Sequence, residues 1–273
     1  MYVNPYANLT DARPLRVNFH THAGTGPNTC GRNPIDQVAE RYRELGYDAL
    51  CLSNHDLYTD ASSYTDDKMT LLDGVEYSPR AHMLTVGIRR SLHELEHQPA
   101  IDETRKDGGF VILCHPNWQH KEYWPWADLD RLTGYLGIEV INQLIYRLSG
   151  SGLAADTWDH LLSSGRLVYG FGNDDFHLYS DAGRSWNWIY APSPAYPDIR
   201  EAEMCIRDRH SADPEQHLRV FNPDSIYLPT KKIGKNNPKA AEIEAAQYNS
   251  WKTSNLSLTS LYFIRPSKYR EIL

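Results

Sequence analysis

Some histidines and acids of this chain are spaced as metal ligands are. His20 and His22 are two residues apart, and such residues point to the same face of a β-strand, so both imidazoles can reach one ion. Asp175 and His177 repeat the spacing with a carboxylate and an imidazole. Because a metal ion makes bound water nucleophilic near neutral pH, the chemistry that this pattern indicates is hydrolysis.

Further candidate ligands stand where short apolar runs end. Glu76 follows the apolar run 71–75, where an unpaired carboxylate would be costly to bury. A single catalytic zinc takes about three protein ligands, so the eight candidates imply two ions, or three, with a shared carboxylate. Mixed imidazole and carboxylate ligation suits Zn²⁺, Mn²⁺ or Fe²⁺ better than Mg²⁺ or Ca²⁺. Six of the twelve histidines fall at expected strand boundaries: His20, His22, His55, His82, His115 and His177.

Each of these signals has an ordinary structural alternative. His55 with Asp56 is more often a surface or capping pair, a lone His82 is more often a hydrogen-bonded structural residue, and Glu76 could pair with an arginine. Their joint placement favours a metal centre, because unrelated histidines would scatter over helices and loops.

The elements that must position these residues follow a simple alternation. Short buried runs alternate with amphipathic helices, which predicts an α/β fold with a mainly parallel sheet. In barrels of this kind the reacting groups lie at the C-terminal ends of the strands. The expected strands are 15–19, 49–52, 110–114, 137–141, 167–171 and 186–190, and the expected helices are 34–45, 100–106 and 156–162.

Composition is that of an ordinary globular protein, with 41% hydrophobic and 23% charged residues. The net charge of −7 argues against nucleic acid as the main partner and is compatible with a small anionic substrate held through cations. The four cysteines form no CxxC pair, which predicts free thiols in a reducing compartment. Without an apparent signal peptide or membrane span, the expected location is the cytoplasm.

Taken together and in this order, the motifs closely resemble the PHP (polymerase and histidinol phosphatase) superfamily of metal-dependent phosphoesterases. The resemblance covers roughly residues 1–202 and implies a distorted (β/α)7 TIM-like barrel with its metal site at the C-terminal ends of the strands. Further likeness at 109–118 and 137–142 points to the branch with carbamate-hydrolysing members. The motifs are 19–22 (Phe-His-Thr-His), 53–56 (Ser-Asn-His-Asp), 74–76 (Gly-Val-Glu), 114–116 (Cys-His-Pro) and 174–177 (Asp-Asp-Phe-His).

The resemblance also implies how the ligands are shared. Glu76 would bridge two ions, and His55 and His177 would serve a third ion or the substrate phosphate. Many relatives have an Asp in a Ser-Asp-Gly motif after the first His pair, whereas residues 23–31 hold no acid or His. Two ions are therefore expected. The first would be held by His20, His22, Glu76 and Asp175, and the second by Glu76, His115 and His82.

A phosphomonoesterase or phosphodiesterase is the function expected from these ligands. Asp175 would orient the nucleophile, and His177 or His55 would stabilise or protonate the leaving group. The same centre could instead hydrolyse a carbamate, amide or ester, or the chain could be a non-catalytic metal-stabilised binding module with closed coordination. Substrate contacts are expected from Asn117, Trp118, Asn142 and Arg184.

The composition changes near residue 203. Residues 1–202 are expected to form the hydrolase domain, and residues 203–273 an atypical tail without further strand-end acid or His motifs. The string 204–209 (Met-Cys-Ile-Arg-Asp-Arg) is typical of translated sequencing-adapter sequence, so we expect the tail to be appended or artefactual.

Overall fold

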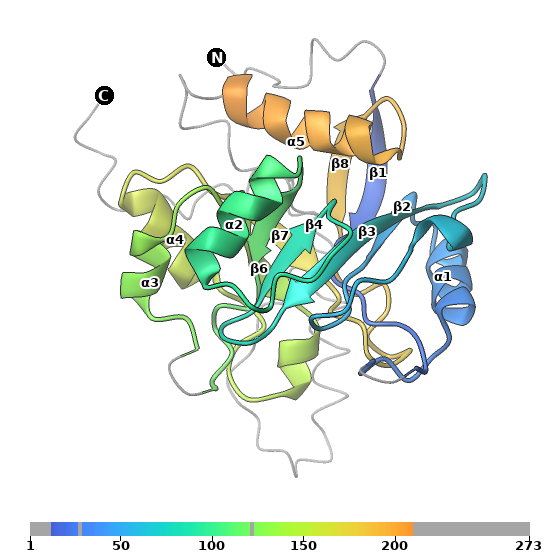
Figure 1. Cartoon of the computed structure of the whole chain (residues 1–273), viewed down its shortest axis with the longest axis horizontal. Helices are drawn as coiled ribbons and strands as arrows, with labels where there is room; N and C mark the ends of the chain where they lie inside the picture. Colours follow the sequence, from blue (N-terminus) through green and yellow to red (C-terminus); the bar gives the residue numbers. More distant parts are fainter. Residues whose placement is uncertain (1–11, 27–28, 121–122, 210–273) are drawn as a thin grey trace, which may run out of the picture. The chain divides into compact units, whose positions relative to one another are not determined.

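The computed structural model describes residues 12–26, 29–120 and 123–209, of residues 203–209 the backbone only. One eight-stranded sheet, in the order β7-β6-β5-β4-β3-β2-β1-β8, forms a nearly closed barrel (Figure 1). The strands are β1 (Arg13–Asn18), β2 (Ala49–Leu52), β3 (Thr70–Tyr77), β4 (Met83–Val86), β5 (Phe110–Leu113), β6 (Gly137–Asn142), β7 (Tyr169–Asn173) and β8 (Asn187–Ala191). The α-helices are α1 (Ile35–Glu44), α2 (His97–Lys106), α3 (Trp126–Arg131), α4 (Ala155–Ser163) and α5 (Tyr196–Arg209).

Two strands depart from a regular parallel barrel. β4 is antiparallel to β3 and β5, and β8 is antiparallel to β1, whereas the other neighbours are parallel. Only residues 78–82 separate β3 from β4, too few for the crossover of about a dozen residues that parallel neighbours need. The predicted α/β, TIM-like barrel is confirmed, and its sheet has eight strands where seven were expected.

Asparagine side chains close the barrel between the two edge strands. The backbone N–H of Gly172 in β7 donates to Oδ1 of Asn187 in β8, and Asn187 Nδ2 donates to the Gly172 carbonyl, both at 3.0 Å. The Phe19 N–H donates to Asn173 Oδ1 at 3.0 Å. A side-chain amide offers the same donor and acceptor as a peptide group, so these amides replace a backbone ladder.

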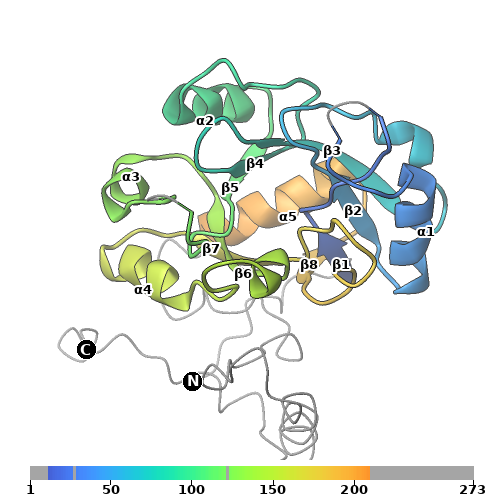
Figure 2. The same ribbon diagram turned by 90° about the horizontal axis from the view of Figure 1, so that it is seen from below.

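Apolar packing on both faces of the sheet fixes the strand ends. Inside the barrel, Phe19 packs edge-on against Phe110 and Phe171, with ring centroids 5.5 and 5.8 Å apart. Helices α1 to α4 surround the strands, with Tyr42 of α1 fully buried (Figure 2). α1 ends at Glu44, and Gly46, two residues later, has a φ of 75°, the left-handed conformation expected of a glycine just past a helix.

Helix α5 packs against the barrel core through Tyr196 and Ile199. The Tyr196 hydroxyl donates to the Gly108 carbonyl at 3.0 Å. The backbone of α5 continues across the expected domain boundary at 202/203. The interpretation of the tail rests on side chains beyond Ala202 and on residues 210–273, which lie outside the described residues, and so it stays a prediction. Within the described part of the chain, no helix combines the length and apolarity needed to cross a bilayer.

Candidate metal centre

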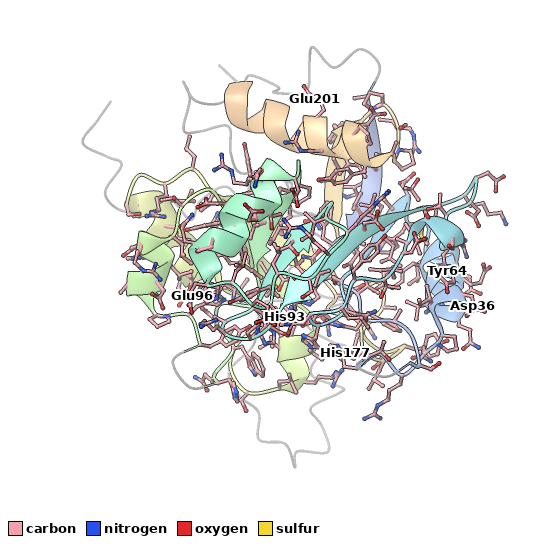
Figure 3. All side chains as sticks on the ribbon, viewed as in Figure 1. Asp36, Tyr64, His93, Glu96, His177 and Glu201 are labelled. Carbon is pink, nitrogen blue, oxygen red and sulfur yellow. The ribbon has the colours of Figure 1, made fainter. Side chains whose placement is uncertain are left out.

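The C-terminal edge of the parallel strands carries every ligand predicted from the sequence. Figure 3 shows the labelled His177 at this edge, away from Glu201 of α5. Because β4 runs antiparallel to its neighbours, the residues before it lie at the same edge. The ligands are His20 and His22 after β1, His55 after β2, Glu76 within β3, His82 before β4, His115 after β5, and Asp175 and His177 after β7.

Four of these side chains surround one point. The Nε2 atoms of His20 and His22 are 3.1 Å apart, and Asp175 Oδ1 lies 3.2 Å from each. Glu76 places Oε1 3.3 Å from His20 Nε2 and Oε2 3.1 Å from His22 Nε2. Ligand atoms about 2.0–2.1 Å from a tetrahedral zinc lie roughly 3.3 Å from one another. The four groups therefore have the spacing of a coordination shell.

Glu76 also faces a second group of imidazoles. His82 Nδ1 lies 2.8 Å from its Oε1, and His55 Nδ1 lies 2.8 Å from its Oε2. His115 Nε2 is 3.4 Å from Glu76 Oε1 and 3.7 Å from Asp175 Oδ2. Glu76 thus faces both groups of imidazoles, and its bridging role stays a prediction.

The charges of the cluster fit divalent cations. Burial raises the pKa of Glu76, but His55 and His20 outweigh burial and hold this pKa well below its usual value. Burial lowers the pKa of His20, whereas Asp175 and Glu139 raise it well above its usual value. The carboxylates thus require positive charge, which protons or metal ions can supply. Asp175 Oδ1 and Glu76 Oε2 are buried and make no hydrogen bond within the described residues, although imidazole nitrogens of His22 and His55 lie 3.2 Å and 2.8 Å from them. Both oxygens are therefore available to an ion.

Glu139, in the middle of β6, supports the ligands from behind and was missed as a site residue in the sequence. It is buried, and its Oε1 accepts hydrogen bonds from His20 Nδ1 at 2.8 Å and Asn173 Nδ2 at 2.9 Å. Its Oε2 accepts from the His115 N–H at 2.9 Å and from Asn142 Nδ2 at 2.8 Å. If its Nδ1 proton is held here, His20 would be able to hold an ion through an unprotonated Nε2. An acid inside the apolar run 137–141 was the available signal.

Two of the ligands have a left-handed backbone. His115 has a φ of 30° and Asp175 a φ of 51°, conformations that cost about 1–3 kcal/mol for residues other than glycine. The hydrogen bond from the His115 N–H to Glu139 and the one from Asn142 Nδ2 to Asp175 Oδ2, at 3.1 Å, help hold them. Such strain is typical of functional sites.

Cys30 is the second neighbour of the centre that was missed. Its Sγ lies 3.2 Å from His22 Nδ1 and 3.3 Å from His177 Nε2. Burial raises the pKa of the Cys30 thiol, but hydrogen bonds from His177, His22 and His55 outweigh burial and lower the pKa to about 4. Residues 23–31 hold no acid or His, and a single cysteine outside a CxxC pair gives no metal-site signal in the sequence.

The four predicted substrate-binding residues differ in their surroundings, and their roles stay predictions. Trp118 borders the cluster, with its ring 5.3 Å from that of His115. Asn142 holds the carboxylates of Glu139 and Asp175. The Asn117 amide donates to the Leu153 carbonyl and to Asp156 at the start of α4. Arg184 is exposed, and its Nε donates to the Ser180 carbonyl at 3.3 Å.

Comparison with known proteins identifies the fold. No protein-family model and no curated protein matches the chain. Among solved structures it is similar to a two-domain protein of Bacteroides vulgatus containing a predicted PHP-like metal-dependent phosphoesterase, with 21% identity and a TM-score of 0.53 over 71% of this chain and 63% of that one. The lesion-specific endonuclease PfuEndoQ of Pyrococcus furiosus matches at 13% identity and a TM-score of 0.49 (71% and 56% covered), and PsfC of Pseudomonas syringae at 13% and 0.48 (88% and 99%).

The PHP-like barrel fold is confirmed, and this chain spans less than two thirds of the Bacteroides protein. The His, Asp and Glu clusters could hold metal ions, as a metal-dependent hydrolase requires. The expectation that nucleic acid is not the main partner stays a prediction. The likeness to the carbamate-hydrolysing branch stays a prediction.

Proposed function

We propose that this protein is a metal-dependent phosphoesterase that hydrolyses phosphomonoesters or phosphodiesters with a water activated at a two-ion centre. The observation that carries the proposal is the spacing of His20, His22, Glu76 and Asp175, whose ligand atoms lie 3.1–3.3 Å apart with two buried carboxylate oxygens open to an ion. Zn²⁺, Mn²⁺ or Fe²⁺ would suit these ligands. The name of the Bacteroides protein, which shares the fold, agrees with phosphoester chemistry.

Some of the side chains would bind the ions, and others would orient water or transfer protons. When bound, the ions would lower the pKa of water and neutralise charge on the phosphoryl oxygens. Glu76 would hold both ions at a fixed separation. Asp175, with Oδ2 fixed by Asn142, would orient the attacking water through Oδ1. His177 or His55 would stabilise or protonate the leaving group.

The site is open on one side, which favours turnover over a purely structural role. The side chains of His20 and Glu76 are fully buried. At the rim, His55 is 32%, His177 19% and His82 16% exposed. A structural metal site is normally closed by its protein ligands. Substrate would reach the centre past these three histidines.

A substrate panel tests the proposal. Purified protein reconstituted with Mn²⁺ or Zn²⁺ would be assayed with nucleoside monophosphates, bis-p-nitrophenyl phosphate and an aryl carbamate. We expect hydrolysis of a phosphate ester and none by the Glu76→Gln variant. Cleavage of the carbamate alone would transfer the proposal to the carbamate, amide or ester alternative. No hydrolysis of any member by fully loaded protein would contradict it and favour the binding module.

A further inference from the structure

A sulfur atom lies within a group of imidazoles at the rim of the centre. Ligand atoms of His22, Cys30, His55 and His177 all lie within 4.8 Å of one another. Of the predicted ligand atoms, His22 Nε2 and His55 Nδ1 already face Glu76. Cys30 Sγ and His177 Nε2, 3.3 Å apart, face each other instead. This group therefore shares the His22 and His55 rings with the clusters around Glu76 and adds Cys30 Sγ and His177 Nε2.

The loop is built so that Cys30 reaches this position. The Gly24 N–H donates to the Asn33 carbonyl at 2.8 Å, and the Thr29 hydroxyl lies 3.1 Å from the Gly24 carbonyl. Gly31 packs so closely on the His22 backbone that a Cβ atom would lie 2.6 Å from the His22 carbonyl oxygen. A glycine at this position lets the chain return to His22, which places the Cys30 sulfur beside its ring.

We propose that Cys30, His55 and His177 bind a third, thiophilic divalent cation at the rim, with the Cys30 sulfur also accepting a hydrogen bond from His22 Nδ1. This inference rests on the proposed two-ion centre and adds a third ion to it. The expectation of two ions alone rested on the lack of an acid or His in residues 23–31. A sulfur 2.3 Å and a nitrogen about 2.0 Å from a tetrahedral zinc lie roughly 3.5 Å apart, close to the observed 3.3 Å. Binding would release any proton that the thiol carries.

A thiolate gives the rim position a different metal preference from the inner centre. Thiolate ligands favour zinc and other soft or borderline ions, whereas carboxylate and imidazole ligands also accept Mn²⁺. The rim position should therefore select Zn²⁺ or Co²⁺ over Mn²⁺. Zinc at the rim with manganese inside is the loading we expect from a mixture of the two.

Cobalt reports sulfur ligation directly. The full chain, stripped of metal and reloaded with Co²⁺, should show a thiolate-to-cobalt charge-transfer band in the near ultraviolet. The Cys30→Ser variant should lose this band and bind one zinc ion fewer per chain. Cys30→Asp, which restores a ligand without sulfur, should recover the third ion without the band and bind Mn²⁺ better relative to Zn²⁺.

A buried cysteine away from the metal-capable clusters serves as the control. Cys51→Ala, in the core of the barrel, should keep both the band and the zinc content. A cobalt protein without the band, or a folded Cys30→Ser protein that keeps it together with its full zinc content, would overturn the proposal. Because the readout is metal content and absorbance, a third ion can fail while hydrolysis persists, and hydrolysis can fail while the band is present.

Discussion

The two histidines after β1 stand in contrasting halves of the same centre. His20 belongs to an inner half, where its Nδ1 donates to buried Glu139. His22 is equally buried but borders a rim half, where its Nδ1 faces the sulfur of Cys30. Both rings turn Nε2 toward Asp175. The Nδ1 atom of one ring contacts a carboxylate, and that of the other contacts a thiol. The inner half therefore has a fixed geometry, whereas the rim half includes side chains that solvent and substrate can reach.

Burial and hydrogen bonding explain the difference. Glu139 accepts from four donors in the inner half, including Asn142 and Asn173, which leaves its ring partner little freedom. At the rim, His55 and His177 remain partly exposed. We therefore expect inner substitutions to act mainly on metal affinity, and rim substitutions mainly on metal selectivity and substrate handling.

Removing the ions should affect both halves and have the largest effect. Thorough chelation should abolish hydrolysis, and Mn²⁺ or Zn²⁺ should restore it. It should also destabilise the fold, because each site at an ion concentration 100 times its Kd contributes about 2.7 kcal/mol. Activity assays and thermal unfolding before and after chelation measure both effects. Full activity after chelation would leave the two-ion mechanism without support.

The ion-free protein should respond to pH in a defined direction. Carboxylates raise the pKa of His20 and His22 above 6.5 in the fold, although burial opposes the shift. The protonated rings therefore stabilise the fold fully below about pH 6.5, and this stability is lost as pH rises through the raised pKa. Zinc should accordingly raise Tm more at about pH 8.5 than at about pH 6. An equal rise at both values would contradict this charge balance.

Glu76→Gln should come next, because Glu76 joins the inner and rim halves. One oxygen of this side chain faces His20 and the other faces His22 and His55. An amide keeps the shape but removes the charge, so metal content and turnover should both fall by more than the roughly 10–100-fold typical of changes behind a ligand. Elemental analysis and kcat measure this. Glu94→Gln, at a glutamate 86% exposed, is the control that should change neither. Unchanged metal stoichiometry would remove the bridging role.

The sequence predicted the edge of the barrel better than its interior. Strand-boundary patterns brought the eight predicted ligands to one edge, because the C-terminal ends of parallel strands converge there and the start of antiparallel β4 lies beside them. His55 and Asp56 behaved differently: His55 faces Glu76, whereas Asp56 accepts from the Ser78 N–H and hydroxyl, the capping role weighed for the pair. Neighbouring residues in a strand end point to opposite faces, so a motif alone cannot assign both.

Contacts between distant segments were beyond sequence reasoning. Glu139 and His20 are 119 residues apart, and Cys30 and His177 are 147 apart. Nothing in residue spacing encodes such pairs, because they depend on how the strands close. The antiparallel β8 and the amide contacts of Asn187 are of the same kind.

Glu139→Gln should weaken the inner half selectively. The carboxylate accepts on both oxygens, whereas a glutamine would turn an NH₂ group toward either His20 Nδ1 or the His115 N–H. Facing His20, it would favour the tautomer that protonates Nε2 and blocks ligation. We expect metal affinity to fall about 10–100-fold, measured by competition with a chelating dye.

The cobalt band should distinguish the Glu139→Gln variant from the Cys30→Ser variant. Cys30→Ser should remove the sulfur-dependent cobalt band, and Glu139→Gln should retain it. If Glu139→Gln instead abolished the band and left inner-site affinity unchanged, the division into inner and rim halves would be wrong.

Arg184→Ala should have the smallest effect and tests how far the rim reaches. The side chain is exposed and bonded to the Ser180 carbonyl, so any contact with a substrate phosphate would be screened by water. Such a contact is worth about 0.2–1 kcal/mol, which predicts a few-fold rise in KM for a phosphate ester at constant kcat. The value of kcat stays constant because the contact would bind ground state and transition state alike. The rise in KM should shrink as salt is added, because salt screens exposed charges.

Arg131→Ala is the matched control, since that arginine is also exposed and lies on α3 in an ion pair with Asp128. It should leave KM unchanged at every salt concentration. A kcat that falls with Arg184→Ala would mean that the guanidinium acts on the transition state, which would extend the rim half to residue 184 and make Arg184 a catalytic residue. A KM identical to that of the parent protein would instead end the substrate contact predicted for Arg184, because an exposed cation without a ligand contributes little to binding.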